Sequence, residues 1–292
     1  STLRTNPTGQ AFLEQHGAQI QDGDIQDFGD ASTERIATRD NTILCALSQF
    51  GTLKISGEDA QTFLQSLLSS DIKALTPQLA QFSSFNTAKG RVLASVLVYR
   101  VGDEYFLHLP AALLAPLQKK LGMYVLRSKV KIEDASTQQA CIGIAGKEAA
   151  ALLQTHLGAA TPGALTLTRH GDADILRLAD DRFQIHTTPE HAANLWAKLS
   201  PHARPVGSSC WDGLNIRAGI PVVLPARQER SVLLMLDLDI LGGVSFKKGC
   251  YPGQEIVARV HHQGKLKQRT YLAHIGGTVA PQANDALYSD DS

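Results

Sequence analysis

Short blocks of apolar residues recur along the first 200 residues of the chain, and their spacing predicts both strands and helices. Residues 92–99 and 105–109 are apolar and flank a Gly-Asp pair, so they predict two antiparallel strands joined by a turn. Within residues 60–68, apolar side chains fall at i, i+3, i+4, i+7 and i+8. This spacing predicts a helix with one buried face. Residues 140–146 predict a further strand of small apolar residues.

One arrangement of elements occurs twice. The hairpin of residues 92–109 precedes a helix that Pro110 opens, and a hairpin of residues 174–187 precedes a helix that Pro189 opens. Proline suits the first turn of a helix, where its missing N–H costs nothing. The repetition predicts an α+β fold made of two similar parts with antiparallel sheets.

Composition narrows the class of protein without naming a function. The chain has 292 residues, of which 43% are hydrophobic and 19% charged, and its formal net charge is zero. These values are ordinary for a globular protein of two or three domains, and the net charge provides no overall attraction to nucleic acid or membranes. Neither a signal core nor an apolar run of about 20 residues is present. We therefore expect a cytoplasmic protein without membrane contact.

The four cysteines lie far apart in the sequence, and none forms a CxxC pair. Free thiols in a reducing compartment are the simplest interpretation. Cys45 and Cys141 lie in apolar strands and are interpreted as structural, while Cys210 beside Trp211 is left undecided. Cys250 differs from the others because two lysines and a glycine precede it.

The loop of residues 246–255 predicts a reactive thiol at Cys250. Nearby positive charge lowers the pKa of a cysteine and favours the nucleophilic thiolate. Glycines and a Tyr-Pro-Gly turn allow the backbone to bend sharply. The alternative is a buried structural cysteine, because free cysteine is among the most buried residue types. We interpret Cys250 as the candidate catalytic residue, and the residues expected to support it are Lys247, Lys248, Gly249, Tyr251, Gly253, Gln254, Glu255 and Arg259.

Residues 247–269 carry six basic residues and a single carboxylate, Glu255. Such a stretch is typical of a site for a polyglutamate tail, a phosphate, RNA or an acidic partner, and equally of a solvated face. The adjacent pair His261-His262 diverges on any regular element, so we expect no metal site there. The nucleotide and hydrolase motifs GxxxxGK[ST], GxGxxG, HExxH and GxSxG do not occur in the sequence.

Residues 242–259, GGVSFKKGCYPGQEIVAR, resemble the signature of the YgfZ family, which are folate-binding proteins related to the T-protein aminomethyltransferase of the glycine cleavage system. Residues 214–221 and 86–92 resemble further segments of that family. The resemblance implies two ferredoxin-like α+β parts and a C-terminal β-barrel, arranged as a ring around a central hole. The boundaries expected here are 1–135 with contributions from 205–255 for the first part, 136–204 for the second, and 256–292 for the start of an incomplete barrel.

The resemblance also implies what the protein binds. Family members bind tetrahydrofolate and serve the assembly or repair of iron–sulfur clusters, including those of tRNA-modifying enzymes. The functional cysteine of the family corresponds to Cys250, and two aromatic positions associated with folate correspond to Phe50 and Trp211. Phe50 departs from the tryptophan frequent in the family, so it keeps a stacking face but lacks an N–H donor.

A second departure bears on catalysis. In the aminomethyltransferases an Asp-Asp pair follows the glycine turn, and one aspartate serves the folate chemistry. The corresponding residues here are Ala94 and Ser95, neither of which can act as a carboxylate acid or base. We therefore predict a monomeric, tetrahydrofolate-binding factor that serves iron–sulfur client proteins. We expect this factor to lack aminomethyltransferase activity, to hold no metal and not to bind RNA directly. The alternative is a folate-dependent one-carbon enzyme of the aminomethyltransferase or demethylase type.

Overall fold

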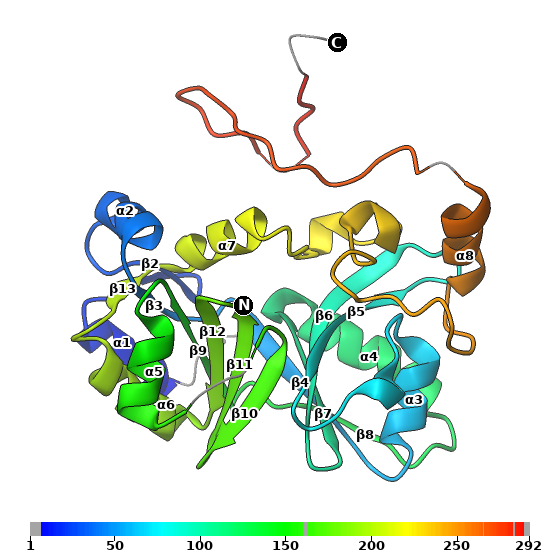
Figure 1. The fold of residues 1–292 in the computed structure, drawn as a ribbon, viewed down its shortest axis with the longest axis horizontal. Helices are drawn as coiled ribbons and strands as arrows, with labels where there is room; N and C mark the ends of the chain where they lie inside the picture. Colours follow the sequence, from blue (N-terminus) through cyan, green and yellow to red (C-terminus); the bar gives the residue numbers. More distant parts are fainter. Residues whose placement is uncertain (1–6, 160–162, 265, 283, 289–292) are drawn as a thin grey trace.

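The computed structural model describes residues 7–159, 163–264, 266–282 and 284–288, and it has a mixed α+β fold. Its strands form a six-stranded sheet, a five-stranded sheet and a separate two-stranded hairpin. The two larger sheets lie next to each other at the centre of the molecule, with helices on their outer sides (Figure 1). The predicted α+β class is therefore confirmed.

The five-stranded sheet contains the first predicted hairpin. Its strands run in the order β5 (Ala80–Asn86), β6 (Val92–Val101), β7 (Glu104–Pro110), β4 (Phe50–Ser56) and β8 (Lys131–Asp134), and all are antiparallel. Helices α3 (Ala60–Leu67) and α4 (Leu114–Val125) pack on it. The apolar face expected of α3 is buried in the core of this half, as its spacing predicts.

The six-stranded sheet contains the second predicted hairpin. Its order is β10 (Thr166–His170), β11 (Ala173–Ala179), β12 (Arg182–Thr187), β9 (Ala140–Ala145), β3 (Ile43–Ala46) and β13 (Arg204–Val206). Helices α5 (Ala149–Leu157) and α6 (Pro189–Leu199) contribute to its core. Strand β3 precedes all strands of the five-stranded sheet in the sequence but pairs with β9. The chain therefore leaves the six-stranded sheet after β3, forms the five-stranded sheet, and then returns to the six-stranded sheet.

The N-terminal segment is more ordered than its polar sequence suggests. It forms α1 (Pro7–Gln15), the hairpin β1 (Gln19–Gln21) and β2 (Asp24–Asp27), and α2 (Ala31–Asp40). Glu34 of α2 is buried, and its carboxylate accepts hydrogen bonds from the backbone N–H groups of Phe28 and Gly207, both at 2.9 Å. These bonds fix the segment to the start of α7 (Ser208–Arg217).

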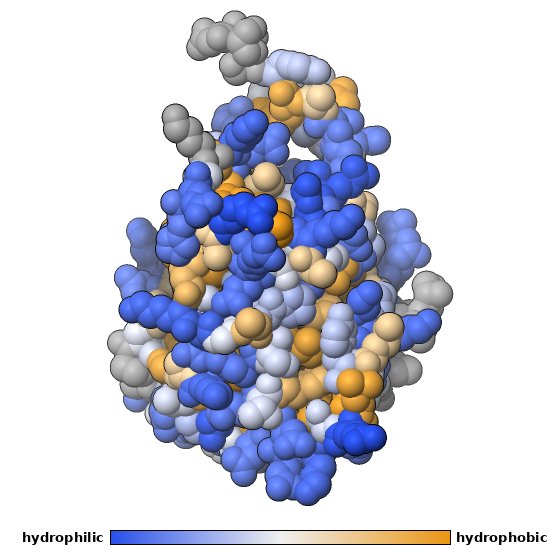
Figure 2. Space-filling view, turned by 90° about the vertical axis from the view of Figure 1, so that its right-hand side faces the viewer, coloured by the Kyte–Doolittle hydropathy of each residue, from blue (hydrophilic) through white to orange (hydrophobic). Residues whose placement is uncertain are grey.

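The chain after α7 returns to the five-stranded half. It forms two short 3-10 turns, at Pro225–Arg227 and Leu233–Leu236, and the helix α8 (Gln254–Gln263). Leu233 and Leu238 are fully buried in the same core as α3 and α4. Figure 2 looks onto the side of the molecule that carries α8, where polar side chains cover most of the surface and apolar patches lie between them.

The described part of the chain contains no closed barrel, which corrects the expected fold at its C-terminal end. Within the range 256–292, expected to begin the barrel, residues 256–263 belong to α8 (Gln254–Gln263), residues 270–275 have no strand assignment, and Tyr271 and Leu272 are 83% and 67% exposed. A strand needs a neighbour to take up its backbone hydrogen bonds, and the described residues after α8 provide none. No helix in the described ranges is long and apolar enough to cross a bilayer.

Candidate functional site

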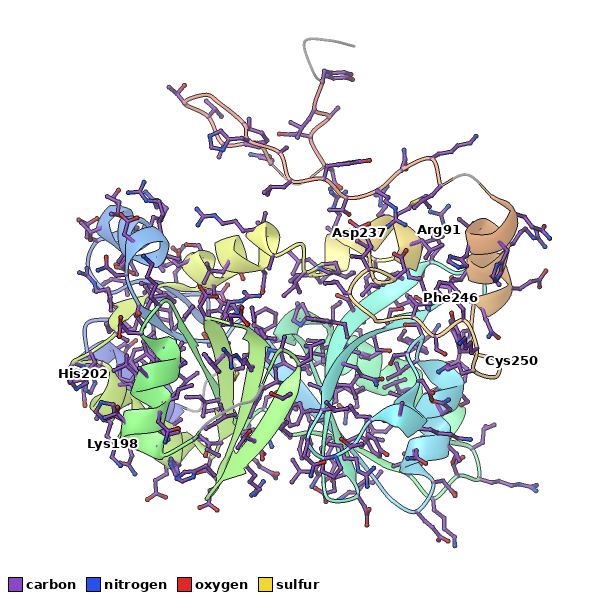
Figure 3. The ribbon with its side chains drawn as sticks, viewed as in Figure 1. Arg91, Lys198, His202, Asp237, Phe246 and Cys250 are labelled. Carbon is purple, nitrogen blue, oxygen red and sulfur yellow. The ribbon has the colours of Figure 1, made fainter. Side chains whose placement is uncertain are left out.

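Cys250 is exposed on a loop that precedes α8. Figure 3 shows this loop at the end of the molecule that carries α3 and α8, with Phe246 nearby. The ring of Phe246 stacks on His261 of α8 at a centroid distance of 3.9 Å. The thiol is therefore presented to solvent from a loop that α8 holds in place, which is the accessibility that a reactive cysteine needs.

Lys248 points into the protein and anchors this loop. Its ammonium donates hydrogen bonds to the backbone carbonyls of Gln65 at 2.7 Å, Ser70 at 2.6 Å, and Leu68. These carbonyls lie at and just after the C-terminal end of α3, where carbonyl groups lack helical partners. Burial lowers the pKa of Lys248 to about 8, and the charge of Asp71 opposes this shift. Lys248, which the sequence predicts to support the thiol by its charge, ties the loop to the C-terminal end of α3.

Gly253 brings together two of the three segments that resemble the family, residues 242–259 and 86–92. Its backbone has a φ of +83°, and a Cβ atom there would lie 2.4 Å from Cα of Gly90. Gly90 belongs to the glycine turn between β5 and β6, which is closed by a hydrogen bond from Gly90 N–H to Thr87 O at 2.9 Å. Residues that are more than 160 positions apart in the sequence are therefore in direct backbone contact.

Replacing Gly253 with alanine is expected to lower the free energy of unfolding by about 2 kcal/mol, because it adds both left-handed backbone strain and a backbone clash. Urea denaturation followed by circular dichroism measures this loss. The matched control is Gly249→Ala in the same loop, where a Cβ would meet nothing within 4 Å. Equal stabilities of the two variants would contradict the contact.

Two more of the predicted loop residues have structural partners. The side-chain amide of Gln254 donates to the carbonyl of Lys248 at 3.1 Å, which closes the loop on itself. Tyr251 is buried, and burial raises the pKa of its hydroxyl to about 12. The ammonium of Lys248 lies 5.1 Å from the centre of the Tyr251 ring, within cation–π range.

Two of the six basic residues in the stretch 247–269 form ion pairs. Arg259 pairs with Glu255 at 2.8 Å, and Arg269 pairs with Asp237 and Asp239 at 2.5 and 3.0 Å. Lys247 is exposed, and Lys265 lies outside the described residues. The two ion pairs reduce the positive charge at Arg259 and Arg269, while Lys247 and Lys267 remain exposed to solvent.

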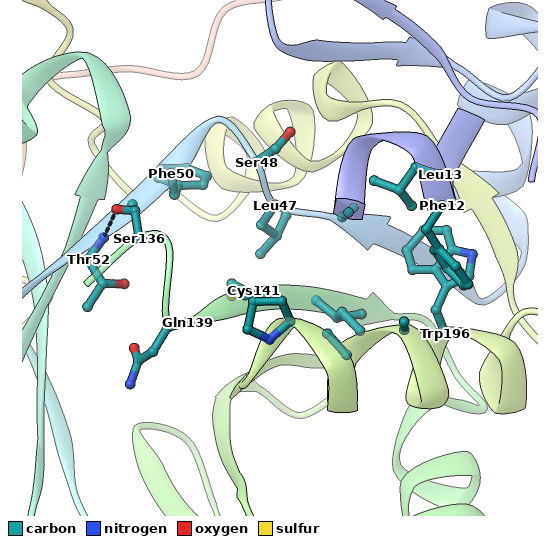
Figure 4. A pocket seen from close by; sticks show the side chains of 18 of the residues that line it. Phe12, Leu13, Leu47, Ser48, Phe50, Thr52, Ser136, Gln139, Cys141 and Trp196 are labelled. Atoms are coloured by element: carbon teal, nitrogen blue, oxygen red, sulfur yellow. Dashed lines mark hydrogen bonds between the residues drawn. The ribbon is translucent and has the colours of Figure 1, made fainter. Parts of the chain in front are cut away.

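Two cavities lie near the centre of the molecule, and Phe50 lines both. The lateral cavity encloses about 840 Å³ including its mouth, and Figure 4 shows Phe50 at one end of it and Phe12 and Trp196 at the other. The inter-sheet cavity encloses about 470 Å³ between strands of both sheets. Both volumes include space that is open to solvent at the mouth. The inter-sheet cavity is lined in part by Phe82, Ser95, His108, Gln184 and Asn215.

Trp211 lies apart from these cavities. Its side chain is fully buried in a hydrophobic cluster against which Phe50 also packs. A Cβ at Gly143 would lie 2.5 Å from the Trp211 ring, so only glycine leaves room for it. The guanidinium of Arg182 lies over the ring at 5.1 Å. The structure thus brings the two predicted aromatic residues, Phe50 and Trp211, into one cluster. Of these two, only Phe50 lines the central cavities. Cys250 lines neither of them.

The two residues that correspond to the Asp-Asp pair, Ala94 and Ser95, carry no carboxylate acid or base. Ala94 is buried, and the hydroxyl of Ser95 donates to the carbonyl of Pro221 at 2.9 Å. No aspartate or glutamate is among the described residues that line either central cavity. The carboxylate chemistry expected of an aminomethyltransferase therefore has no residue to perform it there.

Sequence reasoning missed a group of titratable side chains between the sheets. His108, Cys141 and His186 come from β7, β9 and β12, and their potential ligand atoms lie within 4.8 Å of one another. Burial lowers the pKa of His108 to about 4 and also depresses that of His186, while it raises the pKa of the Cys141 thiol. Only the fold brings these residues together, since no local spacing in the sequence links them.

Known proteins resemble this chain in both sequence and fold. Residues 25–223 match the family model described as the GCVT N-terminal domain. Proteins named tRNA-modifying protein YgfZ from Shigella boydii serotype 4 and Escherichia coli O157:H7 are each 29% identical to it over 246 residues, covering 84% of this chain and 75% of theirs. The glycine cleavage system aminomethyltransferase T from Bartonella henselae shares the fold, with a TM-score of 0.77 at 18% identity over 90% of this chain and 76% of that protein. These findings confirm the predicted relationship, and the chain belongs to the GCVT N-terminal domain family.

Proposed function

We propose that this protein binds tetrahydrofolate and supports tRNA modification by assembling or repairing the iron–sulfur clusters of the modifying enzymes, with Cys250 as its reactive thiol. The similarity to proteins named for tRNA modification supports the process, and the family and the shared fold support a folate-related role. We further propose that it acts in the cytoplasm as a monomer, and that its two α+β halves are ferredoxin-like parts of a ring.

The observation that carries the proposal is the inter-sheet cavity. It combines the Phe50 ring with the side-chain amides of Gln184 and Asn215. A pterin ring is flat and carries several hydrogen-bonding groups, so one stacking face and a few polar groups suit it. The cavity offers no carboxylate base, which favours binding over aminomethyl turnover. Formation of a one-carbon product from tetrahydrofolate and a methylamine donor would support the alternative enzyme instead.

Calorimetric titration with tetrahydrofolate tests the binding site. Wild-type protein is expected to bind saturably, and Phe50→Ala is expected to weaken binding about tenfold, because an aromatic stacking contact contributes roughly 1–1.5 kcal/mol. Tyr124→Ala is the control, since Tyr124 is an aromatic residue on α4 that lines neither central cavity.

Two further variants distinguish the cavities. Phe82 lines only the inter-sheet cavity, and Phe12 lines only the lateral one. Weaker binding in Phe82→Leu but not in Phe12→Leu supports the proposed location, and the opposite pattern moves the site to the lateral cavity. Absence of saturable binding to folded wild-type protein rules out the folate part of the proposal.

A further inference from the structure

Three side chains with metal-binding atoms meet where the two large sheets face each other. His108 comes from the five-stranded sheet, whereas Cys141 and His186 come from neighbouring strands of the six-stranded sheet. His108 is 5% and His186 1% exposed. Sγ of Cys141 lies 3.8 Å from Nε2 of His186, and the ligand atoms of all three residues lie within 4.8 Å of one another.

These distances suit a small ion with little rearrangement. Zinc bonds of about 2.0–2.3 Å in tetrahedral geometry place neighbouring ligand atoms roughly 3.3–3.8 Å apart. The Cys141–His186 pair is already near this spacing, and His108 needs to move by about 1.5 Å or less. Both imidazoles lie against aromatic rings, with Tyr99 4.8 Å from His186 and Phe50 4.8 Å from His108, so packing holds the rings close to this arrangement.

The unpartnered nitrogen atoms are an independent indication. Both ring nitrogens of His108 and Nδ1 of His186 are buried without a hydrogen-bond partner among the described residues. Native proteins rarely leave buried polar atoms unpaired, because each costs about 1–3 kcal/mol. His108 can therefore turn toward an ion without breaking a hydrogen bond.

We propose that His108, Cys141 and His186 bind one divalent transition-metal ion of the zinc class. Two imidazoles and one thiolate suit Zn²⁺ or Co²⁺, whereas Mg²⁺ and Ca²⁺ require oxygen ligands. The imidazoles bind through their lone pairs. The thiol loses its proton to solvent as the metal–sulfur bond forms, so each ion bound as M²⁺ releases one H⁺.

Three protein ligands leave a fourth coordination position. Oε1 of Gln184 lies 3.0 Å from Nε2 of His186, and this amide oxygen either turns away or becomes the fourth ligand when the ion enters. Cys141 and His108 also line the lateral cavity, so a water molecule or a small ligand reaches the ion from that side. The bound ion connects the two sheets directly. His108 and Gln184 also line the inter-sheet cavity, so the ion and the proposed folate share one wall, but the metal site itself requires neither folate nor Cys250.

Cobalt titration of the purified full-length chain, freed of metal by a chelator, tests the site. Binding is expected to produce a thiolate-to-cobalt charge-transfer band that saturates at one equivalent and disappears when Zn²⁺ is added. Cys141→Ser is expected to lose this band, and His108→Gln is expected to weaken cobalt binding more than about 100-fold, since even outer-sphere partners of metal ligands contribute 10–100-fold.

Cys250→Ser is the matched control, because it removes the exposed thiol and leaves the buried cluster intact. An unchanged band in this variant supports the proposal, and a band lost in Cys250→Ser but kept in Cys141→Ser overturns it. The decisive measurement needs no variant: folded wild-type protein that shows no saturable charge-transfer band overturns the proposal. A rise in its thermal midpoint with equimolar Zn²⁺ supports it further, as ligand binding to the native state requires.

Discussion

Cys250→Ser is expected to abolish the ability of this protein to restore iron–sulfur-dependent tRNA modification in cells that lack it. Serine keeps nearly the same size but is a far weaker nucleophile and metal or sulfur ligand than a thiolate. The side chain is exposed, so the free energy of unfolding should change by less than about 0.5 kcal/mol. The measurement is the level of a modified tRNA nucleoside in complemented cells, alongside urea denaturation of the purified variant.

A second cysteine provides the control for this experiment. Cys210 lies on α7 and is buried, so Cys210→Ser removes a thiol without touching the loop. It should sustain tRNA modification at any expression level at which the folded protein accumulates. Full complementation by Cys250→Ser would remove the thiol from the mechanism and leave folate binding as the remaining part of the proposed function.

Lys248→Met is expected to lower the free energy of unfolding by about 3 kcal/mol. The substitution keeps the length of the side chain but leaves three carbonyl groups without their shared donor. Hydrogen bonds to a charged group contribute about 1.5–3 kcal/mol each, and the cost of burying the ammonium offsets part of this sum. Urea denaturation followed by circular dichroism measures the loss.

The neighbouring lysine provides a matched control. Lys247 is exposed, so Lys247→Met should change stability by less than about 0.5 kcal/mol. A thiol reagent added to native protein should also react with Cys250 at a different rate in Lys248→Met, because the loop loses its anchor to α3. Equal stability of the two variants would show that the ammonium does not hold the loop.

The sequence predicts the parts of the fold that depend on local periodicity. The β6–β7 and β11–β12 hairpins and the buried face of α3 each follow from residues close together in the chain, whose alternation or helical spacing selects one structure. Confirmation of the family rests on similarity over most of the chain. These elements need little information from distant residues.

Long-range pairing could not be predicted in the same way. Strand β3 pairs with β9, and the sequence between these two strands contains all the strands of the five-stranded sheet. No local pattern in residues 43–46 specifies β9 as the partner. The direction of Lys248 depends on carbonyls of residues 65–70. His108, Cys141 and His186 likewise come together only because two sheets face each other. In each case the determining contact joins residues that are far apart in the sequence.

The positions of the two tryptophans make intrinsic fluorescence a selective probe of folding. Trp196 on α6 packs in the core of the six-stranded half, and Trp211 on α7 lies in the adjoining cluster that includes Ile43 and Cys45 of β3. The five-stranded half carries no tryptophan, because the chain contains only these two. Fluorescence therefore follows unfolding of the six-stranded half, while far-ultraviolet circular dichroism follows both. Coincident transitions would show that the halves unfold as one cooperative unit, and separate transitions would give each half its own stability.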